Sequence, residues 1–180
     1  MAAAQGKGYL EEFYSRLVQK PITNYDSETN STLDSNPITF PLNQSIYADA
    51  AHEVSIIDFF AALNLTGLSN KAPSDTNPES DSHSFVTSQV VPMGTQFVSQ
   101  VLECKFSQPT KQIRFIVNDA IVPQHYAGCD PKEFNGLCAF DTVTKALAKR
   151  IDEIDFEHDC YGNYTLPVGI EDLNGRAPRD

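Results

Sequence analysis

His52 and Glu53 are the neighbouring residues in this sequence best suited to acid–base chemistry. They follow a short strand-like segment, residues 45–51, and precede an apolar helix expected over residues 54–63. Free backbone N–H groups and the helix dipole favour an anion at a helix N-terminus. The pair therefore predicts a place where a phosphate binds and receives a proton. The alternative is a capped helix, in which Glu53 satisfies first-turn amides and His52 packs at the end of the strand.

The first segment predicts a helix with one apolar stripe, which Pro21 ends. Glu12 and Arg16 are spaced to form an ion pair on this helix. Residues 23–44 are polar and predict an irregular surface crossing. The stripe consists of Leu10, Phe13, Tyr14, Leu17 and Val18, and the residues expected outside it are Glu11, Glu12, Ser15 and Arg16.

The second half of the chain predicts strands and one long helix. Residues 86–104, interrupted by Pro92 and Gly94, and residues 111–117 read as two strands, joined by a hairpin loop at 107–110. An amphipathic helix follows over residues 140–154. A helix after a strand, with ligand groups at the corner, is typical of an α/β fold. The later strands are expected to be an antiparallel addition to it.

The domain expected over residues 1–160 contains an exposed loop at 66–84 and is followed by a polar tail at 161–180. Asp49 leaves two interpretations open, a hydrogen-bonded structural role or support for His52. Asn118 and Asp119 predict a turn whose side chains bond the backbone. The other histidines are expected to be solvated, and they are His83, His125 and His158.

Composition limits the classes of function. The chain of 180 residues has a formal charge of −11, which argues against binding nucleic acid or anionic membranes. No apolar run approaches the roughly 20 residues of a membrane span. The five arginines form no cluster in the sequence, so the main cationic group of a phosphate site would have to come from elsewhere. The cysteines have no zinc-like spacing, and no metal or other cofactor is expected.

Two features indicate a secreted protein. Cys129 and Cys138 bracket a loop of turn-forming residues that can bring their thiols together. Acceptor sequences for N-glycosylation occur at Asn30, Asn43, Asn64 and Asn163. The first residues do not resemble a signal peptide. The simplest resolution is that a preceding N-terminal portion of the protein is missing from this sequence.

Several segments together resemble the fungal histidine acid phosphatases, and among these the secreted phytases. The likeness covers about residues 2–160 and implies the C-terminal part of a three-layer, phosphoglycerate-mutase-like α/β domain. Residues 3–9, Ala-Ala-Gln-Gly-Lys-Gly-Tyr, resemble the family opening Ala-Ala-Gln-Gly-x-Gly-Phe. The other segments that carry the likeness are residues 30–43, 47–53, 90–92, 117–123 and 128–129.

The resemblance implies a mechanism without a metal. A histidine in an Arg-His-Gly-x-Arg motif attacks phosphorus, arginines and a second histidine hold the phosphoryl oxygens, and a carboxyl protonates the leaving alcohol. His52 matches the phosphate-binding histidine and Glu53 the proton donor. The implied substrates are phosphomonoesters such as myo-inositol hexakisphosphate.

The sequence departs from the family pattern at two points. The donor position is Glu rather than Asp, which changes the placement of the carboxyl by one methylene. No Arg-His-Gly occurs in the 180 residues, so the nucleophile is expected in the missing N-terminal portion. The resemblance also implies a Cys129–Cys138 disulfide and leaves Cys104 and Cys160 without their usual partners; the alternative is that these two bond each other.

The leading hypothesis is a partial phytase-like phosphatase that is inactive as this chain alone. The first rival is a secreted, non-catalytic descendant that binds phosphate or has a structural role. The second rival is an intracellular interaction domain with reduced cysteines.

Overall fold

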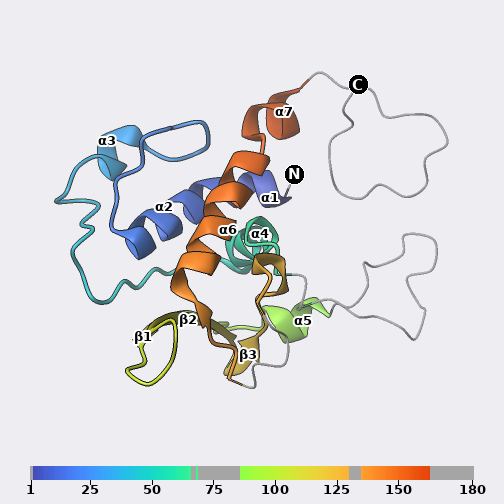
Figure 1. Cartoon of the computed structure of the whole chain (residues 1–180). Coiled ribbons are helices and arrows are strands. Elements are labelled where there is room, and N and C mark those ends of the chain that lie inside the picture. The colour runs from blue at the N-terminus through green and yellow to red at the C-terminus, as the bar shows by residue number, and fades with distance from the viewer. Residues whose placement is uncertain (1, 66–67, 69–85, 130–134, 163–180) are drawn as a thin grey trace. The chain divides into compact units, whose positions relative to one another are not determined.

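The structure is a computed structural model that describes residues 2–65, 68, 86–129 and 135–162. Apart from residue 68, the expected loop at 66–84 lies outside these residues, as do His83 and Asn163. Helices are combined with an antiparallel sheet (Figure 1). The mixed α/β class is therefore as predicted. The chain forms two compact units, residues 1–63 with 148–180, and residues 64–147.

Three helices form the centre of the first unit, namely α1 (Ala2–Gln5), α2 (Lys7–Val18) and α4 (Glu53–Ala62). Gly6 lies at the junction of α1 and α2. A Cβ atom on Gly6 would lie 2.1 Å from the carbonyl oxygen of Asp58. The absence of a side chain at residue 6 therefore allows the start of α2 to approach the backbone of α4 closely.

The apolar stripe of α2 is present, and a polar face beside it is buried as well. Lys7, Glu11 and Ser15 are buried at successive i, i+4 positions. Glu11 and Ser15 lie outside the apolar stripe as predicted, but the structure buries them beneath a loop. Residues 24–29 cover this face, and Ser27 donates a hydrogen bond of 2.5 Å to Glu11. Helical periodicity shows which positions share a face, but it cannot show that a loop supplies polar partners for a second face.

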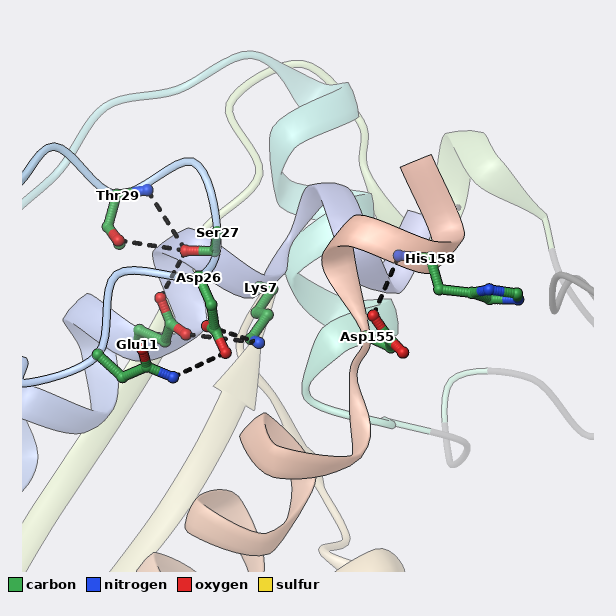
Figure 2. A network of polar contacts seen from close by, with 8 residues as sticks. Lys7, Glu11, Asp26, Ser27, Thr29, Asp155 and His158 are labelled. Carbon is green, nitrogen blue, oxygen red and sulfur yellow. Dashed lines mark hydrogen bonds and ion pairs between the residues drawn. The ribbon is translucent and has the colours of Figure 1, made fainter. Parts of the chain in front are cut away.

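The ion pairs under this loop are visible in Figure 2. The Nζ atom of Lys7 lies 2.8 Å from Oδ1 of Asp26 and 3.9 Å from Oε1 of Glu11. Asn24 donates a further hydrogen bond of 2.8 Å to Asp26. The buried ammonium is thus compensated by two carboxylates, as burial of a charge requires.

Residues 45–51 do not form a strand, and this part of the prediction is wrong. They are irregular up to His52, whose backbone is extended with φ −80° and ψ 159°. A strand is defined by hydrogen bonds to a neighbouring strand, and no described segment pairs with these residues. The apolar sequence alone could not show whether such a neighbour was present.

Helix α4 is present as predicted, but only its second half is buried. Phe59, Phe60 and Ala62 are buried, whereas Val54 is 57% exposed. The first turn of this apolar helix is therefore solvent-exposed. Arg150 supplies a hydrogen-bond donor to the C-terminal end of α4. Its Nε atom donates a hydrogen bond of 3.0 Å to the carbonyl oxygen of Ala62. A cation at the last carbonyls stabilises a helix C-terminus.

The helix predicted at 140–154 is confirmed as α6 (Phe140–Glu153). Its apolar positions are buried as expected at Phe140, Val143 and Leu147. Two short helices of the first unit were not predicted. They are α3 (Ser31–Asp34), which Asn30 caps, and α7 (Phe156–Tyr161), which Asp155 caps through a 3.0 Å hydrogen bond from the backbone N–H of His158 (Figure 2).

The second unit contains the sheet. Strands β1 (Phe97–Glu103) and β2 (Lys111–Val117) pair antiparallel as the predicted hairpin, and β3 (Ala120–Val122) and β4 (Cys138–Ala139) also pair with β2. Residues 86–91 do not extend β1, contrary to the prediction. They contain the short helix α5 (Thr87–Val90).

Asn118 and Asp119 form the turn between β2 and β3, as predicted. Both adopt positive φ, 48° and 66°. Two successive left-handed residues match the twist of a tight hairpin. The side chain of Asn118 accepts a 3.1 Å hydrogen bond from the N–H of Gln96 and donates one of 2.9 Å to the carbonyl oxygen of Val90. This turn therefore also fixes the entry into β1.

A disulfide joins Cys129 and Cys138, so the structure contains the expected pairing. Cys104 and Cys160 are free thiols. His125 is exposed in a short 3-10 helix (His125–Ala127), as expected. His158 is half-buried, in contrast to the expectation of a solvated side chain.

Candidate active site

His52 and Glu53 lie at the start of α4, where sequence reasoning placed them. His52 is the N-cap residue and Glu53 is the first helical residue. Both are exposed, and the imidazole makes no capping hydrogen bond. The interpretation in which His52 packs at the end of a strand is therefore wrong. An exposed imidazole and carboxyl beside unsatisfied first-turn N–H groups can meet an anion from solution.

The segment before the pair is tied to α2 through Asp49. The Oδ2 atom of Asp49 accepts a 2.9 Å hydrogen bond from the hydroxyl of Tyr9 and one of 2.6 Å from Nη1 of Arg16. Asp49 thus has the hydrogen-bonded role that was one of its two interpretations. The carboxylate lies three residues before His52, so these bonds hold the chain that leads into the site.

Arg16 is the centre of a larger cluster. Its Nη2 atom lies 3.4 Å from Oε2 of Glu12, which confirms the expected i, i+4 pair. Its guanidinium carbon lies 5.0 Å from the ring centroid of Phe40 and 5.3 Å from that of Tyr47. Cation–π contacts at these distances add to the ion pair with Asp49. Arg16 therefore contacts the irregular chain before the site at three residues, Phe40, Tyr47 and Asp49.

The segment after the pair is held by the same helix. The ring of Tyr9 contacts that of Phe59 edge-on, with centroids 4.8 Å apart, and Phe13 contacts it at 5.4 Å. Edge-to-face pairs of this kind are favourable. Phe59 lies six residues after Glu53 on α4. Tyr9 therefore contacts the chain on both sides of the candidate site.

Burial is the main cause of the pKa shifts of three residues on α2 and α4. Burial, together with the hydrogen bond to Asp49, raises the pKa of the Tyr9 phenol, so it remains a donor at every physiological pH. Burial also raises the pKa of Glu12, with a contribution from the charge of Asp34, although Arg16 opposes the shift. Burial similarly raises the pKa of the Asp58 carboxyl on α4.

The described residues contain no group of three or more His, Cys, Asp or Glu side chains that could hold a metal ion. Within the same residues, none of the helices combines the length and the apolar character needed to cross a bilayer.

Sequence reasoning identified Arg16 only as the partner of Glu12 and did not identify Tyr9. Tyr9 lies outside the apolar stripe of α2, so periodicity gave no signal for its packing or for a hydroxyl partner 40 residues away. The contact follows from the course of the irregular segment, which periodicity does not define.

Comparisons with known proteins identify the family of the chain. A model of the histidine phosphatase superfamily (branch 2) matches residues 1–118. The chain is 34% identical over 148 residues to Phytase A of Emericella nidulans, 35% over 149 residues to that of Aspergillus fumigatus, and 35% over 150 residues to that of Aspergillus awamori. These matches cover 82% of this chain but 31% of each relative, so the chain spans about a third of their length.

The chain therefore belongs to the histidine phosphatase superfamily (branch 2). The proteins to which it is similar within this superfamily are the fungal enzymes named Phytase A. His52, Glu53, Asp49 and the contacting residues of α2 all lie inside the matched range.

Proposed function

We propose that this chain carries the phosphate-binding and proton-donating part of a phytase-like histidine acid phosphatase. The observation that carries the proposal is the exposed His52–Glu53 pair at the start of α4, within the part of the chain that matches the family. His52 binds the phosphoryl oxygens, and Glu53 protonates the alcohol that leaves. The substrate is a phosphomonoester, with myo-inositol hexakisphosphate as the leading candidate.

The nucleophile of the proposed reaction lies on a stretch of chain outside these residues. The 180 residues contain no Arg-His-Gly, and the relatives are about three times as long as the matched segment. A phosphohistidine intermediate divides the hydrolysis into two displacements. The carboxyl of Glu53 donates its proton in the first one. Residues 1–160 are proposed as a portion of that phosphatase domain, and residues 161–180 as a tail.

Secretion and glycosylation of the complete protein are part of the proposal. The Cys129–Cys138 disulfide is typical of oxidising compartments. Three of the four sequon asparagines, Asn30, Asn43 and Asn64, are exposed and so are accessible to a glycan. The side-chain oxygen of Asn30 also accepts hydrogen bonds from the backbone N–H groups of Thr32 and Leu33 at the start of α3.

The role of Glu53 is tested in the complete protein by varying the leaving group. We expect Glu53→Gln to slow hydrolysis of alkyl phosphates far more than hydrolysis of p-nitrophenyl phosphate, because nitrophenolate leaves without a proton. His52→Ala should slow both substrates alike, since phosphoryl oxygens are bound whatever the leaving group. Equal losses for both substrates in Glu53→Gln would show that Glu53 is not the donor.

A non-catalytic, phosphate-binding or structural descendant is the second candidate. It is favoured by one observation, the Glu at a position where the family pattern has Asp, because a misplaced carboxyl loses activity steeply. The reading frame upstream of Met1 separates the two candidates. A frame that encodes Arg-His-Gly-x-Arg supports the enzyme, and a complete gene without that motif supports the descendant.

A further inference from the structure

Two parts of one side chain contact the chain on opposite sides of the candidate site. The hydroxyl of Tyr9 donates to Asp49, three residues before His52, and its ring packs against Phe59, six residues after Glu53. The contacts are short, with an O···O distance of 2.9 Å and a centroid separation of 4.8 Å. The corner that presents the pair is thus held from both sides by one residue of α2.

The hydrogen bonds that Asp49 accepts from the Tyr9 hydroxyl and from Arg16 are the contacts that can control the corner. The pair is exposed and residues 45–51 have no strand partner among the described residues, so local hydrogen bonding does not define its position. Asp49 is 38% exposed, while its partner Arg16 is 15% exposed and is held by the rings of Phe40 and Tyr47. The fixed side of the contact is therefore α2, and the side that would move is the segment leading to His52.

We propose that Tyr9 is a positioning residue for the proton donor, acting through Asp49 to set where the chain turns into α4 and hence where the carboxyl of Glu53 lies. This inference rests on the proposed function. Only Ala50 and Ala51 lie between Asp49 and His52, a span of at most about 10 Å, so a shift of the Asp49 carboxylate is passed on to the corner. A displacement of about 1 Å at a reacting group costs about 100-fold in rate.

Tyr9→Phe tests the hydroxyl with little change in packing, because the ring that contacts Phe59 remains. Tyr14→Phe is the matched control, since it removes a hydroxyl from the same helix. In the complete protein we expect Tyr9→Phe to lower kcat for alkyl phosphates by about 10- to 100-fold. For p-nitrophenyl phosphate and for KM we expect little change, and we expect none of these effects in Tyr14→Phe.

A double-mutant cycle distinguishes positioning from a general loss of structure. If Tyr9 acts through Glu53, Tyr9→Phe should have no further effect on alkyl phosphate hydrolysis once Glu53→Gln is present. A merely structural role would lower both substrates equally and would add to the effect of Glu53→Gln. Either of these results would overturn the proposal.

A second measurement does not depend on activity. In the 180-residue chain, the His52 imidazole signals, assigned by their loss in His52→Gln, should shift or broaden in Tyr9→Phe but not in Tyr14→Phe. Unchanged signals would overturn the positioning role even if the protein is a phosphatase. A complete wild-type protein without phosphatase activity would instead overturn the proposed function, while the spectra would still report whether Tyr9 holds the corner.

Discussion

The ammonium of Lys7 lies 2.8 Å from the carboxylate of Asp26, beneath the loop that covers the polar face of α2. The side chain of Lys7 is 4% exposed and that of Glu11, its second partner, is 6% exposed. The loop partner Asp26 is 50% exposed, so the buried charges of this contact are on the helix side. The stability of this contact depends on the protonation of its carboxylates.

Glu11→Gln should flatten the dependence of unfolding free energy on pH. Burial, opposed by the Ser27 hydrogen bond and by Lys7, raises the pKa of Glu11 from 4.5 to about 7. A folded-state pKa above the unfolded value stabilises the protein at low pH, and that contribution is lost as the pH rises from about 4.5 to about 7. The loss is about 3 kcal/mol at most, and urea unfolding across this window measures it.

Glu28→Gln is the control for this experiment, because Glu28 is an exposed carboxyl in the same loop region. The titration of Asp26 does not contribute to the pH dependence in this window. Burial raises its pKa, but the Lys7 ammonium more than offsets this, so the net shift is downward. The contribution of Asp26 is therefore lost only at lower pH. An identical slope in wild type and Glu11→Gln would contradict the assignment.

Gly6→Ala should destabilise the first unit by about 1–3 kcal/mol. The added methyl group would lie 2.1 Å from the carbonyl oxygen of Asp58, so the start of α2 must move away from α4. Thermal unfolding measures the effect, and Gln5→Ala is the control because residue 5 is exposed on the neighbouring helix. Equal melting temperatures in the two variants would mean that the close approach is absent in solution.

Thiol labelling should separate the four cysteines into two classes. Cys129 and Cys138 should react only after reduction, whereas Cys104 and Cys160 should react in the native protein or form intermolecular dimers. Burial and neighbouring carboxylates raise the pKa of the Cys160 thiol, so it should react slowly because the thiolate is the nucleophile. Recovery of a Cys104–Cys160 peptide would refute this description.

The 180-residue chain, expressed alone, should show no phosphatase activity toward phytate or p-nitrophenyl phosphate at acidic pH. No Arg-His-Gly is present to form a phosphohistidine. Colorimetric phosphate release measures the activity. Turnover that survives purification and disappears in His52→Ala would show that these residues contain a complete catalytic site.

Local patterns in the sequence determined the longer regular elements. The spacing of apolar residues predicted α2, α4 and α6, and the alternation in residues 111–117 predicted β2 and its hairpin. Burial of these positions follows from periodicity, because 3.6- and 2-residue repeats place apolar side chains on one face. The position of the His52–Glu53 pair at a helix start was predictable for the same reason.

The tertiary structure alone decided what the irregular segments do. Residues 45–51 read as a strand by composition, but a strand exists only where another strand pairs with it. The burial of Glu11 depends on a loop that supplies its hydrogen-bond donor Ser27. The position of the Asp49 carboxylate depends on hydrogen bonds from Tyr9 and Arg16, which are 40 and 33 residues away in the sequence. Such contacts have no period in the sequence, because the course of the whole chain brings the partners together. The sequence therefore determined which residues could do chemistry, and only the fold decided which side chains hold them in place.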